Sequence, residues 1–217
     1  MRSLVERIRP AQGAPEGALV LLHGRGADEH DLIPLIEVLD PDQRLVGVAP
    51  RAPLASADGG RHWYEVERVG YPDPASFLAA AEALGDWLDD LPERIDVPAE
   101  RIVLGGFSQG CVMAYATGLA ADREPPAALL ALVGFVPHVV GHALDLASAD
   151  RPPVLIAHGS RDPVIDVSFG RAARDELVAA GMDVTYRETA VEHTVDADWL
   201  GDLRRTIGLA LRPPARD

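Results

Sequence analysis

The sequence has no lysine and no asparagine, and its 217 residues include a single cysteine, Cys111. A chain without lysine cannot form a Schiff base with a carbonyl substrate, and a chain without asparagine offers no acceptor for N-glycosylation. One cysteine excludes an intramolecular disulfide and most metal sites built from thiolates. These absences remove four otherwise common features from consideration, wholly or for the most part.

Long apolar runs and net positive charge are missing as well. The longest strongly apolar run, 127–137, falls far short of the ~20 residues that a membrane helix needs. Charges interrupt the N-terminal segment where a signal peptide would need an apolar stretch. The formal net charge of −14 repels nucleic acid and anionic membranes on average. We expect a cytoplasmic protein that neither binds nucleic acid nor inserts into a membrane, and the sequence leaves homodimerisation open.

Composition and patterning favour one α/β domain spanning residues 1–217. Apolar residues make up 47% and charged residues 25%, which is ordinary for a globular chain of one-domain length. Apolar runs predict strands at 18–22, 44–49, 101–105, 127–136, 153–158 and 183–187. Helical patterns follow at 28–39, 74–91, 109–121, 168–180 and 196–211. This alternation predicts a mostly parallel twisted sheet with helices on both faces, and the long loops 51–73 and 136–153 are expected to wall a site.

The most informative motif is Gly106-Phe-Ser-Gln-Gly110, which fits the pattern G-x-S-x-G. A predicted strand precedes it and a predicted helix follows it, which is the context that the motif requires. On such a sharp turn the serine hydroxyl is pushed into solvent, and the flanking glycines let the chain pass without collision. We therefore predict that Ser108 is a nucleophile.

A serine nucleophile needs a base, and the acid and the histidine should follow it in that order along the chain. Asp162 and His193 both follow predicted strands, so they should meet Ser108 at the carboxyl edge of the sheet. His193 is assigned as the base and Asp162 as the acid that orients it, with Asp166 as a rival acid. His158 is expected to be a packed residue at a strand end, and His138 and His142 are expected to be solvated or to line the pocket.

Two backbone N–H groups are expected to form an oxyanion hole. The N–H of Gln109 begins the helix after the nucleophile, and the N–H of Arg25 lies in the loop after the strand at 18–22. Both would face the oxyanion, and each such donor is worth about 3 kcal/mol in the barrier. His23 in the same loop is expected to be structural rather than a proton carrier.

Together the stretches 21–32 (LLHGRGADEHDL), 106–110 (GFSQG) and 158–164 (HGSRDPV) resemble the phospholipase/carboxylesterase family. That family includes acyl-protein thioesterases, and dienelactone hydrolases are its relatives. The resemblance covers about 18–207. It implies a compact α/β hydrolase without a large cap domain, a triad of Ser108, Asp162 and His193, and no cofactor or metal. It also places Trp63 beside the acyl site, although Trp63 could equally anchor its long loop.

The chain departs from the family pattern in the segment 133–136, where relatives often have Ser-Gly, and at two single positions, Glu192 and Cys111. Glu192 replaces the usual glycine before the base, where its carboxylate could stabilise the imidazolium or point to solvent. Cys111 replaces a small glycine or alanine, and we expect it to fill buried space rather than to react.

The expected reaction is acyl transfer from a small-molecule ester, of short or medium acyl chain, through an acyl-enzyme; thioesters and lysophospholipids are open by resemblance only. The alternative is a catalytically silent binding protein of the same fold. A dinucleotide-binding protein is disfavoured because Glu29 occupies the third glycine position of its fingerprint. A metal hydrolase built on His23, Asp28, His30 and Asp31 lacks a recognised ligand spacing.

Overall fold

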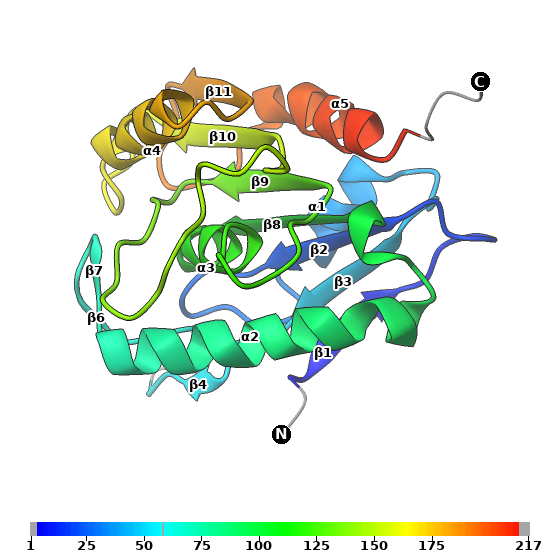
Figure 1. Ribbon diagram of the computed structural model, residues 1–217, viewed down its shortest axis with the longest axis horizontal. Helices are drawn as coiled ribbons and strands as arrows, with labels where there is room; N and C mark the ends of the chain where they lie inside the picture. Colours follow the sequence, from blue (N-terminus) through cyan, green and yellow to red (C-terminus); the bar gives the residue numbers. More distant parts are fainter. Residues whose placement is uncertain (1–3, 58, 213–217) are drawn as a thin grey trace.

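The computed structural model describes residues 4–57 and 59–212. Its centre is a seven-stranded sheet in the order β1-β3-β2-β8-β9-β10-β11 (Figure 1). The strands of this sheet are β1 (Glu6–Arg9), β2 (Ala18–Leu22), β3 (Val46–Pro50), β8 (Ile102–Phe107), β9 (Ala128–Leu132), β10 (Val154–Gly159) and β11 (Val184–Thr189). Only β1 pairs antiparallel, with β3, so the sheet is mostly parallel as predicted.

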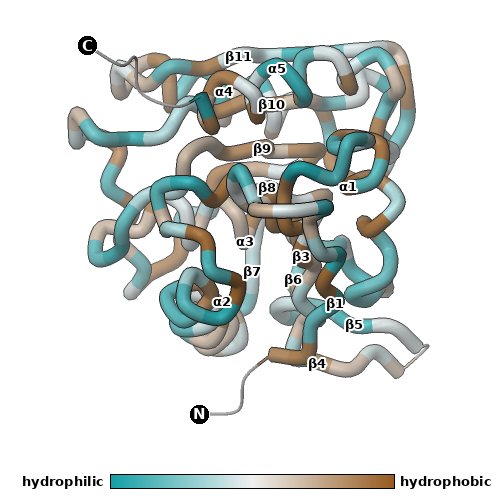
Figure 2. Tube along the Cα trace, turned by 90° about the vertical axis from the view of Figure 1, so that its right-hand side faces the viewer, coloured by the Kyte–Doolittle hydropathy of each residue, from teal (hydrophilic) through white to brown (hydrophobic). Residues whose placement is uncertain are grey.

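Helices cover both faces of the sheet. They are α1 (Ile33–Leu39), α2 (Pro74–Ile95), α3 (Gln109–Gly118), α4 (Val167–Ala179) and α5 (Leu200–Ala210), with short 3-10 turns η1 (Ala99–Arg101) and η2 (Ala197–Trp199). Residues of α2, α3 and α4 belong to one buried apolar cluster, and residues of α1 and α5 belong to a second. Because the central strands are buried on both sides, they consist of nearly continuous apolar residues. In Figure 2, β9 is accordingly brown for most of its length in the middle of the molecule.

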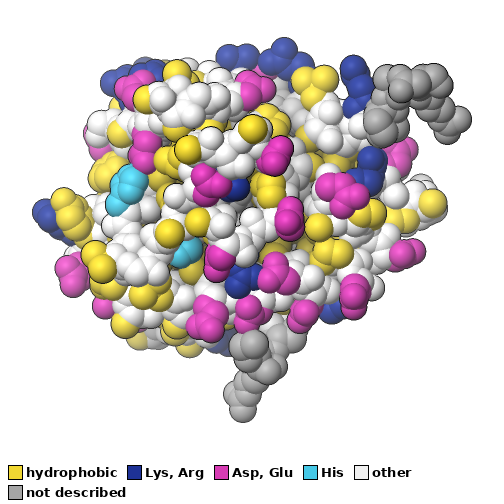
Figure 3. Space-filling model, viewed as in Figure 1, with side chains coloured by type: hydrophobic (Ala, Val, Ile, Leu, Met, Phe, Trp, Pro, Cys, Tyr) yellow, Lys and Arg dark blue, Asp and Glu magenta, His cyan; other side chains and the backbone are white. Residues whose placement is uncertain are grey.

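The longest helix, α2, begins at the predicted residue and continues four residues past the predicted end at 91, to Ile95. Asp73 caps its N-terminus by accepting a hydrogen bond from the Ser76 N–H at 2.9 Å, and Pro74 occupies the first turn. Phe77, Leu84 and other apolar side chains face the core. The opposite face carries many of the acidic side chains that Figure 3 shows in magenta over this part of the surface.

Several elements differ from the prediction. The strand expected at 127–136 ends at Leu132 because Val133 adopts a left-handed φ of +58°, which a continuing strand cannot accommodate. The helix expected from residue 28 begins only at Ile33, after a series of turns. Strand β1 was not predicted at all. Residues 133–153, all of which are described, connect β9 to β10 without a helix, so they form no cap domain.

The long loop 51–73 forms two small antiparallel hairpins. The first pairs β4 (Leu54–Ala55) with β5 (Arg61–His62), and the second pairs β6 (Val66–Arg68) with β7 (Tyr71–Pro72). Among the described residues, no helix is both long enough and apolar enough to cross a bilayer.

Candidate active site

Ser108 occupies a sharp turn between β8 and α3. Its φ is +55° and its ψ is −117°, a combination that an ordinary residue avoids. Gly106 and Gly110 allow this turn because a Cβ atom on either would overlap backbone atoms, those of Gly110 in the first case and those of Leu22 in the second. The serine is thereby held at the carboxyl edge of the sheet with its hydroxyl beside the loop that follows β11.

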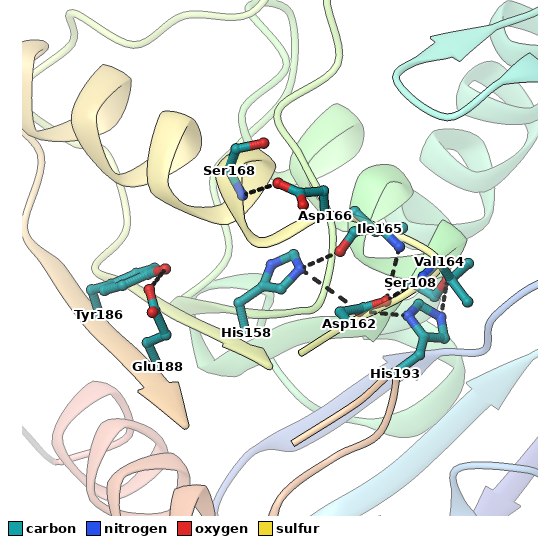
Figure 4. Close-up of polar contacts among 10 residues, drawn as sticks. All are labelled: Ser108, His158, Asp162, Val164, Ile165, Asp166, Ser168, Tyr186, Glu188 and His193. Carbon is teal, nitrogen blue, oxygen red and sulfur yellow. Dashed lines mark hydrogen bonds and ion pairs between the residues drawn. The ribbon is translucent and has the colours of Figure 1, made fainter. Parts of the chain in front are cut away.

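Three predicted side chains lie in hydrogen-bond contact at this edge. The Nε2 atom of His193 lies 3.0 Å from the Oγ of Ser108, and its Nδ1 lies 2.7 Å from an Oδ2 of Asp162 (Figure 4). The Asp162 side chain is fully buried, whereas that of His193 is one-fifth exposed. Because an ionised carboxylate only accepts hydrogen bonds, Nδ1 must carry the proton, and Nε2 is left to accept the serine proton.

The backbone holds Asp162 in a fixed orientation. Its Oδ1 accepts the N–H of Val164 at 2.7 Å and the N–H of Ile165 at 2.9 Å, so Oδ2 is the oxygen that faces the imidazole. Sequence reasoning did not find these two donors, since their role depends on the turn that the loop after β10 adopts.

The rival acid, Asp166, lies apart from this arrangement. It caps α4 by accepting the N–H of Ser168 at 2.9 Å, and hydrogen bonding first with the Ser168 side chain and then with this N–H lowers its pKa.

The other downstream histidines have different surroundings. His158 is fully buried, its Nε2 donates to the carbonyl of Ile165 at 2.9 Å, and burial lowers its pKa. His142 contacts the carbonyl of Ala116 at 2.9 Å, and His138 is exposed beside a glutamate of α4. None of the three contacts Ser108 through a hydrogen bond in the part of the chain that the structure describes.

The loop that carries Arg25 packs directly against the nucleophile. A Cβ atom on Gly24 would lie 3.3 Å from the ring of Phe107 and 3.4 Å from the Cβ of Ser108. Within residues 4–57 and 59–212, the backbone N–H of Arg25 makes no hydrogen bond to the chain, and that of Gln109 lies in the first turn of α3, where helical partners are absent. Both predicted donors are therefore available to an oxygen atom bound beside Ser108.

Trp63 does not line the space beside Ser108. It is fully buried, its indole N–H donates to the carbonyl of His23 at 2.9 Å, and its backbone N–H donates to the side chain of Gln109 at 2.7 Å. This geometry corresponds to the loop-anchoring alternative for Trp63, and a direct contact with substrate stays a prediction.

His23 is buried and bonded through both ring nitrogens. Its Nε2 accepts the N–H of Ala52 at 3.0 Å, so Nδ1 is the donor to the carbonyl of Gly24 at 2.7 Å. Burial lowers its pKa and keeps the ring neutral. These contacts agree with the structural role expected from the sequence.

A small apolar cavity of about 140 Å³ opens beside Ser108. Its walls come from the β6–β7 hairpin, from Phe135 after β9 and from Ile165 after β10. Arg25 and Gln109, which carry the predicted oxyanion donors, also line it. Part of the 51–73 loop therefore walls the site as expected, although the sequence did not reveal the hairpin that does so.

The structure shows the surroundings of Glu192 and Cys111, the two single residues that differ from the family pattern. Glu192 is exposed. Cys111 is fully buried, and burial raises the pKa of its thiol.

One group of neighbouring side chains contains possible metal ligands. Asp28, Glu29 and His30 offer ligand atoms within 4.8 Å of one another. The Arg51 guanidinium already bonds both oxygens of Glu29 and lowers its pKa to about 2.

A serine, a histidine and a buried aspartate at the carboxyl ends of a parallel sheet, on a strand–turn–helix, define an α/β hydrolase. The chain belongs to the phospholipase/carboxylesterase family, whose model matches residues 4–211.

Individual relatives agree with this assignment. The chain is 31% identical over 182 residues to an acyl-protein thioesterase 1 of Yarrowia lipolytica, an alignment that covers 78% of this chain and 79% of the relative. Among solved structures it is similar to esterase PE8, with 30% identity, a TM-score of 0.81, and coverage of 96% of this chain and 100% of that chain. A Bacillus cereus carboxylesterase at 22% identity, with a TM-score of 0.79 and coverage of 95% and 94%, shows the same fold.

Proposed function

We propose that this hydrolase cleaves carboxylic esters of short to medium acyl chain through an acyl-enzyme on Ser108. The observation that carries the proposal is the continuous contact from Ser108 Oγ through His193 to Asp162, at 3.0 and 2.7 Å. A serine hydroxyl is a weak nucleophile unless a base accepts its proton, and this arrangement supplies the base.

The first half of the reaction forms the acyl-enzyme. The Nε2 of His193 accepts the proton of Ser108 while Oγ bonds to the ester carbonyl carbon. The carbonyl oxygen becomes an oxyanion that the N–H groups of Arg25 and Gln109 stabilise. The bond to the alcohol oxygen then breaks, and the alcohol leaves with the proton from His193.

Water completes the cycle by the same steps. It loses a proton to His193, adds to the acyl carbon, and releases the carboxylic acid as Ser108 regains its proton. Asp162 holds the proton on Nδ1 throughout and stabilises the imidazolium that forms transiently. The chain's own residues supply every proton acceptor and donor in these steps, so the proposal includes no cofactor and no metal.

The size of the cavity supports short acyl chains. Its volume of about 140 Å³ lies below the ~300 Å³ at which pockets for drug-sized ligands begin. The curated relatives named acyl-protein thioesterases make a small thioester the second substrate to test. The cytoplasmic location expected from the sequence stays a prediction.

The proposal is tested by hydrolysis of p-nitrophenyl butyrate in the presence of a chelator. We expect measurable turnover by the wild-type protein and a loss of at least ~10³-fold in Ser108→Ala. Turnover that survives Ser108→Ala would remove Ser108 as the nucleophile. An inactive wild-type protein whose Ser108 also resists a phosphonate would favour the silent binding protein instead.

A further inference from the structure

The segment Arg61–Tyr64, called here the oxyanion bracket, touches both loops that carry the predicted oxyanion donors. On one side, the carbonyl of Arg61 accepts the N–H of Gly26 at 2.7 Å, and the N–H of Arg61 donates to the carbonyl of Ala27 at 2.8 Å. These bonds fix the chain directly after Arg25.

The indole of Trp63 fixes the chain two residues before Arg25, at His23. Its N–H donates to the carbonyl of His23 at 2.9 Å, and the two rings pack with their centroids 5.6 Å apart. Trp63 is fully buried, so this bond is shielded from water. The bracket therefore holds the Arg25 loop from both ends.

The other side of the bracket is joined to the nucleophile turn by the side chain of Gln109. Its Oε1 accepts the backbone N–H of Trp63 at 2.7 Å, and its Nε2 donates to the carbonyl of Tyr64 at 2.7 Å. This amide is buried, and its oxygen and its nitrogen both bond to the backbone of the bracket, at two adjacent residues. The residue that offers a backbone N–H to the oxyanion thus also anchors the bracket through its side chain.

We propose that the oxyanion bracket, through the indole of Trp63 and the side-chain amide of Gln109, sets the separation and direction of the Arg25 and Gln109 N–H groups, so that both side chains are positioning residues for the oxyanion. The inference rests on the proposed function. It assigns Trp63 a role through the backbone rather than through contact with the acyl chain. Preorganised donors are effective because they need no rearrangement when charge develops, so a displaced donor loses rate even when the fold survives.

The test compares Trp63→Phe with Trp87→Phe. Both variants remove one indole N–H from a buried ring, and the Trp87 N–H donates to Glu6 of the edge strand β1 at 2.7 Å rather than to a loop that carries an oxyanion donor. We expect Trp63→Phe to lower kcat for p-nitrophenyl butyrate by about 10-fold or more with little change in KM. Trp87→Phe should lower the thermal midpoint comparably and leave kcat within about twofold of wild type.

A second readout separates positioning from general weakening. A trifluoromethyl ketone adds to Ser108 and forms an anionic oxygen in the oxyanion hole, so its Ki should rise in Trp63→Phe by the same factor by which kcat/KM falls. Gln109→Met should give a larger parallel loss. The ionised carboxylate of Gln109→Glu has no hydrogen to donate to the carbonyl of Tyr64, whereas the protonated carboxyl has one. The ratio of the kcat of this variant to that of the wild-type enzyme should therefore be higher at pH 6 than at pH 8.

The outcomes distinguish this inference from the proposed function. Unchanged kcat and Ki in Trp63→Phe and Gln109→Met, with a wild-type enzyme that the ketone inhibits and Ser108→Ala inactivates, would overturn the bracket alone. A wild-type protein that the ketone fails to inhibit while it still hydrolyses the ester would overturn the bracket together with the acyl-enzyme.

Discussion

Replacing Asp162 by asparagine changes which nitrogen of His193 carries the proton. In the wild-type protein, Oδ1 of Asp162 accepts two backbone N–H groups at 2.7 and 2.9 Å, and Oδ2 faces Nδ1 of His193 at 2.7 Å. In the variant the amide oxygen keeps the two backbone bonds, because its NH₂ group cannot accept them. The NH₂ group then faces Nδ1 and forces that nitrogen to accept, which moves the proton to Nε2.

An imidazole protonated on Nε2 cannot accept the proton of Ser108. In other serine hydrolases the same change of tautomer lowers kcat by about 10⁴-fold, which corresponds to about 5.4 kcal/mol in the barrier. We expect a loss of this order for Asp162→Asn in the hydrolysis of p-nitrophenyl butyrate. KM should change little, because Asp162 is buried behind His193 and does not line the cavity.

Asp166→Asn is the matched control, because Asp166 is the acid that sequence reasoning left as a rival. Asp166 caps α4 through the N–H of Ser168, and asparagine caps helices nearly as well. This variant should fold normally and keep kcat within about twofold of wild type. An Asp162→Asn enzyme within about tenfold of wild type, or an equal loss in Asp166→Asn, would refute the assignment.

Four further outcomes follow from the structure. The thiol of Cys111 is buried and its pKa is raised by burial, so a thiol reagent at pH 8 should label it only after denaturation; rapid labelling of the native protein would contradict this. Burial lowers the pKa of His158 in the folded state, so the folded chain binds fewer protons than the unfolded chain, whose histidines titrate near ~6.5. The neutral His158 therefore contributes its full stabilisation above a pH of about 6.5, and this stabilisation is lost as the pH falls below that value. The decrease in thermal midpoint from pH 7.5 to 5.5 should be smaller in His158→Gln than in the wild-type protein. An equal decrease in the two proteins would exclude the effect. Butyrate esters should be hydrolysed at least about tenfold faster than dodecanoate esters, measured as kcat/KM, because the cavity is small. A chelator should leave the rate unchanged, and inhibition that Zn²⁺ or Mg²⁺ reverses would implicate the cluster that includes Asp28 and His30.

The sequence predicted those elements whose formation depends on local pattern. The strand at 18–22 coincides with β2, and the strand–turn–helix around Ser108 coincides with β8 and α3. Buried parallel strands are continuous apolar runs, and the turn needs glycine at fixed spacing, so both leave clear signals. The order Ser, Asp, His along the chain, together with the positions of Asp162 and His193 after predicted strands, predicted the three side chains that the fold brings into contact, with Asp166 left as a rival acid.

Other features depend on contacts between distant segments. The edge strand β1 (sequence ERIR) has no alternating apolar pattern, since Glu6 is half-buried, Arg7 and Ile8 are exposed and Arg9 is buried. It forms because β3 offers it a partner. The end of β9 depends on a left-handed φ at Val133, a β-branched residue that gives no warning of it. The bond between the Gln109 side chain and the Trp63 N–H joins residues that are 46 positions apart in the sequence. Trp63 lies in a loop whose sequence has no regular hydrophobic pattern. The contacts of the Gln109 side chain were not predicted for this reason.

The most direct test of Ser108 as the nucleophile is to treat the folded protein with a fluorophosphonate and map the modified peptide by mass spectrometry. The contacts of Ser108 with His193 predict one adduct, on Ser108, formed at a rate that falls steeply in His193→Ala and absent in Ser108→Ala. An adduct on another residue, or no adduct on a protein that still hydrolyses p-nitrophenyl butyrate, would contradict the proposed mechanism.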